Sequence, residues 1–106
     1  MKNETENFLH RRMIETVKCE FDGVSFYLTL GFYPENRVGE IHVSGFKHGS
    51  SMDAIAQDCC IIITELLQRF VSPLTLTELV NKNPDGSPAS LIGAIAFYLQ
   101  QEVSED

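Results

Sequence analysis

The chain has 106 residues, of which 43% are hydrophobic and 22% are charged, which is the composition of one ordinary globular domain. A formal net charge of −7 disfavours nucleic acid as a partner, because binding to a nucleic-acid backbone comes mostly from neutralised phosphates. No apolar run approaches the ~18 residues needed to span a bilayer, so we predict no membrane partner.

Residues 1–12 are polar and lack the apolar core of a signal peptide, and we expect this segment to be flexible. The three cysteines are odd in number and lie at apolar positions, which is not the pattern of a disulfide framework. Cys59 and Cys60 are adjacent on a predicted helix and diverge by about 100°, so they do not converge on one metal ion. The sequence therefore predicts free thiols, no metal, no cofactor and a cytoplasmic location.

Residues 14–46 show the period-two alternation of a three-stranded antiparallel meander. Asp22 and Gly23 form a strong hairpin signal between the first two strands, because both positions tolerate positive φ. The second strand covers residues 24–33, and the third covers residues 39–46. The apolar residues of all three strands should share one face, while the other face of the second strand carries Ser25, Tyr27, Thr29, Gly31 and Tyr33.

Helical periodicity begins after Gly49, with Ser50 as the expected N-cap. At 100° per residue, one broad apolar stripe should cover the sheet, and it consists of Met52, Ile55, Ala56, Cys59, Ile62, Ile63, Leu66, Leu67 and Phe70. The solvent-facing side is expected to carry Asp53, Gln57, Thr64 and Gln68. Pro73 is predicted to end this helical region.

Two further helices are expected. Thr75 should cap a short one that reaches about Val80, and Ser87-Pro88 should start another that ends near Gln101. The sequence thus predicts an α+β fold in which a three-stranded antiparallel meander is followed by a long amphipathic helix and two further helices, packed on one face. This single domain would cover residues 13–101, with an acidic, frayed tail at residues 102–106.

Several motifs occur in a recognisable order along the chain. They are Arg11-Arg12, Tyr27-Leu28-Thr29-Leu30-Gly31-Phe32-Tyr33, Gly39-Glu40-Ile41-His42-Val43 and Lys47-His48-Gly49-Ser50-Ser51. From about residue 11 to residue 100, the chain resembles the TSCPD domain, the C-terminal module of adenosylcobalamin-dependent ribonucleotide reductases, here as a stand-alone chain. The resemblance implies an accessory module of deoxyribonucleotide synthesis that lacks the catalytic barrel of the reductase.

One departure from the family pattern concerns its namesake run, Thr-Ser-Cys-Pro-Asp followed by Ala-Ile-Ala. That run falls on residues 89–96, where Leu91, Ile92 and Gly93 replace the cysteine, proline and aspartate. Whatever chemistry the family cysteine performs is therefore absent from this position.

The turn Lys47-His48-Gly49-Ser50-Ser51 is a candidate anion or phosphate site. A strand that ends at a helix N-terminus gathers backbone N–H groups and a positive partial charge, and here basic side chains and hydroxyls lie beside them. The competing interpretation is structural: Gly49 forms the turn, Ser50 caps the helix and Lys47 is solvated. Both interpretations stay open at this level.

Two surfaces are candidate protein interfaces. Ile61 falls near the centre of the polar side of the long helix, close to Ala54, and small and apolar residues of this kind suit a helix–helix contact. Tyr27 and Tyr33 lie on the outer side of the second strand, and tyrosine is enriched at interfaces.

The leading functional hypothesis is an accessory or regulatory module that binds a protein partner or a nucleotide, without intrinsic catalysis and with no residue assigned as catalytic. The partner would be a larger reductase subunit or a second copy of the chain. One alternative is a structural dimerisation or adaptor domain of phage-like origin. A less favoured one is a small stand-alone enzyme of nucleotide metabolism that uses Glu40, His42 and Lys47.

Binding of phosphate at the turn is testable by thermal unfolding. Phosphate should raise the Tm of the parent chain, because a ligand that binds only the folded state stabilises it. The double variant Lys47→Ala with His48→Ala should show no such rise. Equal shifts in the two chains would contradict an anion site at this turn.

Overall fold

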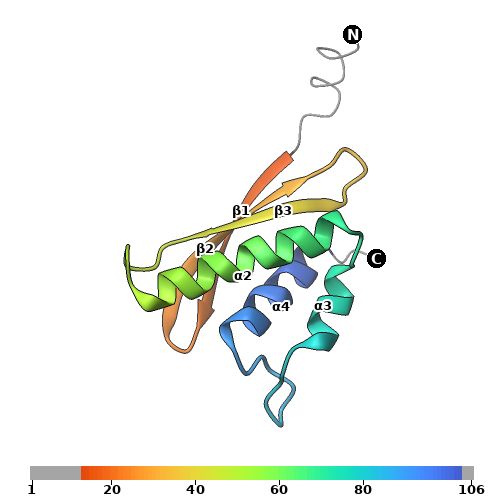
Figure 1. Cartoon of the computed structure of the whole chain (residues 1–106). Coiled ribbons are helices and arrows are strands. Elements are labelled where there is room, and N and C mark those ends of the chain that lie inside the picture. The colour runs from red at the N-terminus through yellow and green to blue at the C-terminus, as the bar shows by residue number, and fades with distance from the viewer. Residues whose placement is uncertain (1–12, 104–106) are drawn as a thin grey trace.

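The computed structural model describes residues 13–103 (Figure 1). In chain order, the elements are β1 (Met13–Phe21), β2 (Val24–Phe32), β3 (Val38–Ser44), α2 (Ser51–Gln68), α3 (Pro73–Leu79) and α4 (Leu91–Val103). The strands form one antiparallel sheet in the order β1-β2-β3. The helix α4 lies under one face of this sheet, and α2 runs along its β3 edge (Figure 1). The predicted α+β class is confirmed. The expected flexible segment 1–12 and the tail residues 104–106 lie outside the described residues.

The β1–β2 hairpin turns at the predicted residues. Asp22 and Gly23 have φ values of 54° and 80°, the two positive values that a type I′ turn requires. Phe21 consequently pairs with Val24, and the register continues without a break to the other end of the two strands. This register places the predicted apolar residues of β1 and β2 on the same face.

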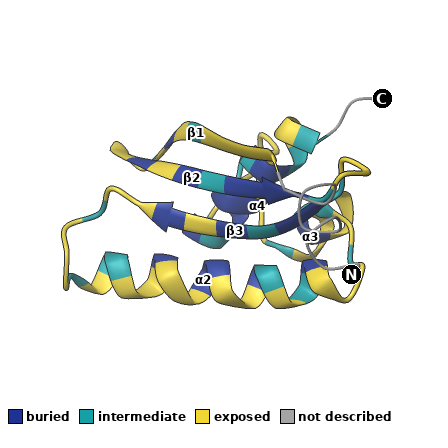
Figure 2. Cartoon of the chain, turned by 90° about the horizontal axis from the view of Figure 1, so that it is seen from above, coloured by how far each residue is buried: buried dark blue, intermediate teal, exposed yellow. Residues whose placement is uncertain are grey.

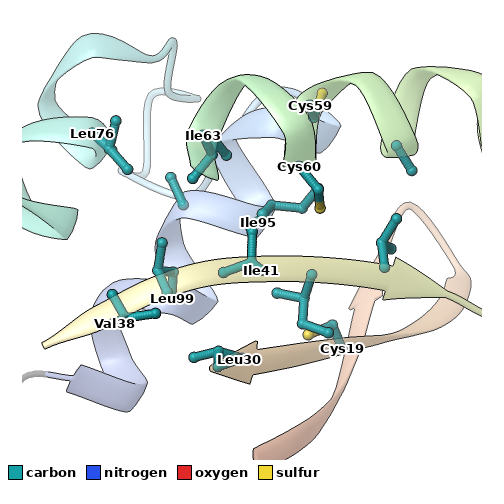
Figure 3. Close-up of a cluster of buried hydrophobic side chains, with 14 of the residues drawn as sticks. Cys19, Leu30, Val38, Ile41, Cys59, Cys60, Ile63, Leu76, Ile95 and Leu99 are labelled. Atoms are coloured by element: carbon teal, nitrogen blue, oxygen red, sulfur yellow. The ribbon is translucent and has the colours of Figure 1, made fainter. Parts of the chain in front are cut away.

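One core lies between the inner face of the sheet and the helices (Figure 3). Its most deeply buried side chains come from β1, β2, β3, α2 and α4, and they are Cys19, Phe26, Leu28, Leu30, Ile41, Ile63, Ile95 and Leu99. Each large aliphatic or aromatic member contributes on the order of 1.5–3 kcal/mol by leaving water. This core sets the position of α4 beneath the sheet.

The helix α2 runs beside β3, along the sheet edge that faces away from β2 (Figure 2). Alternation in an antiparallel ladder directs the backbone groups of every second residue of β3 toward that edge. Ile41 is one of them, and its N–H donates to Thr64 Oγ1 at 3.0 Å while Thr64 Oγ1 donates to the Ile41 carbonyl at 3.3 Å. The threonine hydroxyl thus replaces the neighbouring strand that β3 lacks.

Two glutamines extend this contact along the edge. Gln57 Nε2 donates to the Val43 carbonyl at 3.2 Å, and Gln68 Nε2 donates to the Gly39 carbonyl. Gln57 and Gln68 are exposed, as predicted, whereas Thr64 is half-buried. Their polar groups satisfy the edge of β3, because unpaired backbone groups of an edge strand need a hydrogen-bond partner.

This placement rotates α2 relative to the sequence expectation. Ala56, Cys59, Ile63 and Leu67 of the predicted stripe are buried, and so is Cys60. Met52 and Leu66 of the stripe are partly buried against the core, whereas Ile55, Ile62 and Phe70 are 51%, 54% and 74% exposed.

The boundaries of the last two helices also differ from expectation. α2 ends at Gln68, and Pro73 opens α3 instead of ending α2, with Ser72 as its N-cap in place of Thr75. The helix α4 starts at Leu91, after an irregular segment that includes Ser87 and Pro88.

The C-terminal helix continues through Val103, two residues past its predicted end at Gln101. It is tied to the hairpin end of β1, because the Glu20 N–H donates to Tyr98 Oη at 3.2 Å and Tyr98 Oη donates to the Glu20 carbonyl at 3.3 Å. Residues 102 and 103 of the predicted frayed tail are therefore helical.

The role of Thr64 can be measured directly. Thr64→Val keeps the shape of the side chain but leaves the Ile41 backbone without a partner, and we expect a loss of about 1–3 kcal/mol in the free energy of unfolding. Urea unfolding followed by circular dichroism gives this value. Thr77→Val is the matched control, since the Thr77 hydroxyl bonds only a carbonyl of its own helix, and it should change stability by less than about 0.5 kcal/mol. An equal loss of stability in both variants would contradict the role of the Thr64 hydroxyl as the partner of the Ile41 backbone.

Candidate functional site

The predicted anion turn precedes α2, as the sequence indicates. Gly49 has φ of +82°, and Ser50 is the N-cap: its Oγ accepts the Asp53 N–H at 3.1 Å and donates to the Lys47 carbonyl at 2.7 Å. Lys47 and His48 are exposed. The turn therefore combines the structural roles foreseen for Gly49 and Ser50 with basic side chains that are open to solvent. Anion binding there stays a prediction.

The two candidate interfaces differ in their geometry. Ala54 and Ile61 lie two turns apart on one exposed side of α2, and Ile61 is 63% exposed, as the sequence predicts. Tyr27 lies on the outer face of the sheet opposite Ser44, and it is 41% exposed. Tyr33 lies beyond the other end of β2, roughly 20 Å along the strand. The two tyrosines therefore do not form one patch.

Further apolar residues emerge on α2 that the sequence interpretation assigned to the core. Ile55 and Ile62 are seven residues apart, so they lie above one another on the helix. Asp58 and Glu65 are both exposed, and on the helix surface they lie between the Ile55–Ile62 pair and Ile61. We call the set Ala54, Ile55, Asp58, Ile61, Ile62 and Glu65 the exposed side of α2. The sequence carries a signal for this exposed side, because the predicted apolar stripe is wider than the surface that a helix buries against one sheet.

Residues 90–93, which the sequence comparison above set against the namesake run of the TSCPD domain, lie at the start of α4. Leu91 is buried, and the Ser90 hydroxyl accepts the Gly93 N–H at 3.2 Å. A Cβ at Gly93 would lie 3.3 Å from Ser90 Oγ and 3.5 Å from Val80 Cγ2, so this position packs closely. These residues fill space and begin a helix.

A cavity of about 570 Å³ lies beside this helix start, against the hairpin end of the sheet. Its lining is Glu20, Phe21, Asp22, Asn83, Ser87, Pro88, Ala89, Ala94, Phe97 and Tyr98. In the described structure this lining has two carboxylates and no lysine or arginine. Like charge therefore disfavours the phosphate of a nucleotide here.

The acid–base candidates are spread over the molecule. Glu40 and His42 form a contact of 3.7 Å on the outer face of β3. Lys47, the third candidate, is exposed in the turn that precedes α2. Across residues 13–103, no three His, Cys, Asp or Glu side chains come together as a group that could hold a metal ion.

All three cysteines are free thiols, as predicted, and all are buried. Cys60 points toward the sheet while Cys59 points away from it (Figure 3), so the two diverge as the helix geometry requires. Burial, helped by the negative charge of Glu102, raises the pKa of Cys19 to about 12. Burial also raises the pKa of Cys60 to about 12, and burial with the charge of Asp58 raises the pKa of Cys59. These thiols are protonated at neutral pH and are therefore poor nucleophiles.

Thiol labelling tests this arrangement. At pH 8, a thiol with a pKa near 12 has about a thousandfold less thiolate than an ordinary cysteine, so the native chain should react slowly with Ellman's reagent. In denaturant, three thiols per chain should react at once. Fast native reaction of Cys19 or Cys60, or fewer than three thiols after unfolding, would contradict the buried, unpaired state.

Comparison of the chain with models of protein families, with curated proteins and with solved structures finds no match. Among the helices of residues 13–103, none combines the length and the apolar character required to cross a membrane. The resemblance to the TSCPD domain accordingly stays a proposal, supported by the motifs between residues 11 and 51.

Proposed function

We propose that this chain is a non-catalytic module related to the TSCPD module of adenosylcobalamin-dependent ribonucleotide reductases. It binds a larger catalytic subunit through the exposed side of α2. The observation that supports docking at this surface is the exposure of three isoleucines on two turns of one helix: Ile55 is 51%, Ile61 63% and Ile62 54% exposed. Clustered apolar residues on a surface mark interaction sites, whereas scattered ones need no explanation.

The chemistry of this surface defines its partner. Complete burial of an isoleucine is worth on the order of 1.5–3 kcal/mol, and each of these three has about half of that still to gain. Asp58 and Glu65 lie between the isoleucines. The partner surface should therefore be apolar with basic groups, since like charges opposite these carboxylates would oppose association.

Binding suits this molecule better than turnover. General acid–base catalysis needs its groups within hydrogen-bond reach of one substrate, and Glu40 and His42 lie on the outer sheet face while Lys47 lies in the turn before α2. The thiols are in the core and protonated. The basic turn at Lys47 and His48 adjoins the exposed side of α2, so a nucleotide or phosphate bound there would lie next to the docked subunit.

The test uses the catalytic chain of an adenosylcobalamin-dependent reductase from which the terminal module has been removed. Sedimentation velocity of the mixture should show a complex with the parent chain. The double variant Ile55→Asp with Ile62→Asp should weaken that complex at least about tenfold, because it places charge in an apolar contact. Ile61→Asp should weaken it as well, and all three positions should tolerate aspartate in the folded chain because they are exposed.

Leu79→Asp is the matched control, since Leu79 is 70% exposed at the end of α3, away from the exposed side of α2. It should leave the complex unchanged. Circular dichroism of each variant establishes that the fold is kept. A mixture without any complex, or an equal loss with Leu79→Asp, would overturn the proposal.

A further inference from the structure

The β2–β3 connection presents one arginine toward the end of α2. This connection is closed by two backbone bonds, from the Tyr33 N–H to the Arg37 carbonyl and from the Asn36 N–H to the Tyr33 carbonyl, each 2.8 Å long. Asn36 has φ of +68°, a conformation that asparagine adopts more readily than most residues. This tight turn places Arg37 next to the end of α2, where its side chain contacts Phe70.

The guanidinium of Arg37 lies between two aromatic rings. Its Cζ is 4.5 Å from the centroid of the Tyr33 ring and 4.6 Å from that of the Phe70 ring. Tyr33 is itself held by a hydrogen bond of 3.1 Å from its Oη to Gln68 Oε1. These two cation–π contacts hold the guanidinium in place and leave the N–H groups at its edge for hydrogen bonding.

Phe70 occupies a position where glycine is the usual residue. It has φ of +67°, and the bonds Phe70 N–H to Leu67 O and Val71 N–H to Leu66 O form the Schellman motif that ends α2. A bulky residue in this conformation is a genuine outlier. Its ring is 74% exposed yet covers Arg37, a contact that glycine would not make.

The edge of the guanidinium is only partly used. Arg37 Nε contacts Glu35 Oε2 at 3.3 Å, and within residues 13–103 its two terminal nitrogens have no hydrogen-bond or ion-pair partner. Arg37 also lines a cavity of about 260 Å³. The other lining residues are mostly aliphatic or aromatic, and they are Asn36, Val38, Leu67, Phe70, Val71, Ser72, Pro73 and Val103.

From this geometry we infer a binding site for a small monocarboxylate with an apolar body. The carboxylate takes the two terminal nitrogens of Arg37, whose planar fork matches two carboxylate oxygens. The apolar body fills the cavity beside Phe70 and Val71. A phosphate dianion is disfavoured, because the lining is apolar and Glu35 already supplies one negative charge. This site is separate from the exposed side of α2 and does not depend on the proposed function.

Titration with phenylacetate, followed by the amide signals of residues 36, 70 and 71 in nitrogen–proton correlation spectra, tests the site. Phenylacetamide removes the charge and keeps the ring, and acetate keeps the charge and removes the ring. Both should bind at least about tenfold more weakly than phenylacetate, because each lacks one of the two recognised groups. Arg37→Gln and Arg37→Lys should cause a similar loss, since the glutamine has no charge and the lysine has no fork.

Arg69→Gln is the matched control, because Arg69 adjoins Phe70 in sequence but pairs with Glu65 at 3.8 Å. It should change the affinity less than about twofold, as expected for an exposed charge outside the contact. The spectra also report whether each variant is folded. Equal binding of phenylacetamide or acetate, an equal loss in Arg69→Gln, or no site-specific shifts with phenylacetate would overturn the inference.

Discussion

The open edge of β3 is the constraint on which the arrangement of this molecule depends. Its outward backbone groups at Gly39, Ile41 and Val43 have no neighbouring strand in the described structure and must be satisfied in another way. Three polar side chains at helical spacing on α2 donate to the carbonyls of these three residues, and Thr64 also accepts the Ile41 N–H. The helix therefore lies beside the sheet, in the place of a fourth strand, and only one side of its apolar stripe reaches the core.

Two surfaces follow from that placement. Because Ala56, Ile63 and Leu67 face the core, Ile55 and Ile62 are turned toward solvent and create the apolar surface that we assign to a partner. The end of α2 is brought to the β2–β3 turn, since Gln68 bonds both the strand edge and Tyr33. The aromatic pair around Arg37 is therefore a consequence of the same contact. A helix that crossed the sheet face would produce neither surface.

The sulfur chemistry of the chain is also governed by packing. Burial in an apolar core raises the pKa of a thiol because the thiolate loses its hydration. Cys19, Cys59 and Cys60 are free thiols that fill space in the core between β1, β3 and α2. None of the described cysteines is therefore an accessible nucleophile.

Local patterns were sufficient for the elements that short-range chemistry determines. The turn at Asp22 and Gly23, the alternation along β1 and β2 and the cap at Ser50 depend on neighbours in sequence, so the α+β class followed from the sequence by itself. The starts of α3 and α4 were missed because Ser72 and Ser90 compete as caps with other serines and threonines nearby, and only the packed chain selects among them.

The candidate sites divide in the same way. Sequence placed Ile61 in solvent correctly, since its position on the helix did not depend on the partner of α2. It placed Gln57 and Gln68 in solvent correctly but could not show that they and Thr64 bond the edge of β3, because a polar side chain is equally suited to water and to an unpaired strand edge. Nor could it place Phe70, whose left-handed backbone and stacking on Arg37 arise where α2 meets the β2–β3 turn. The sequence by itself determined the strands, the hairpin and the amphipathic character of the long helix; the tertiary structure alone decided which side of that helix meets the sheet, because the choice is made by backbone groups on a distant strand.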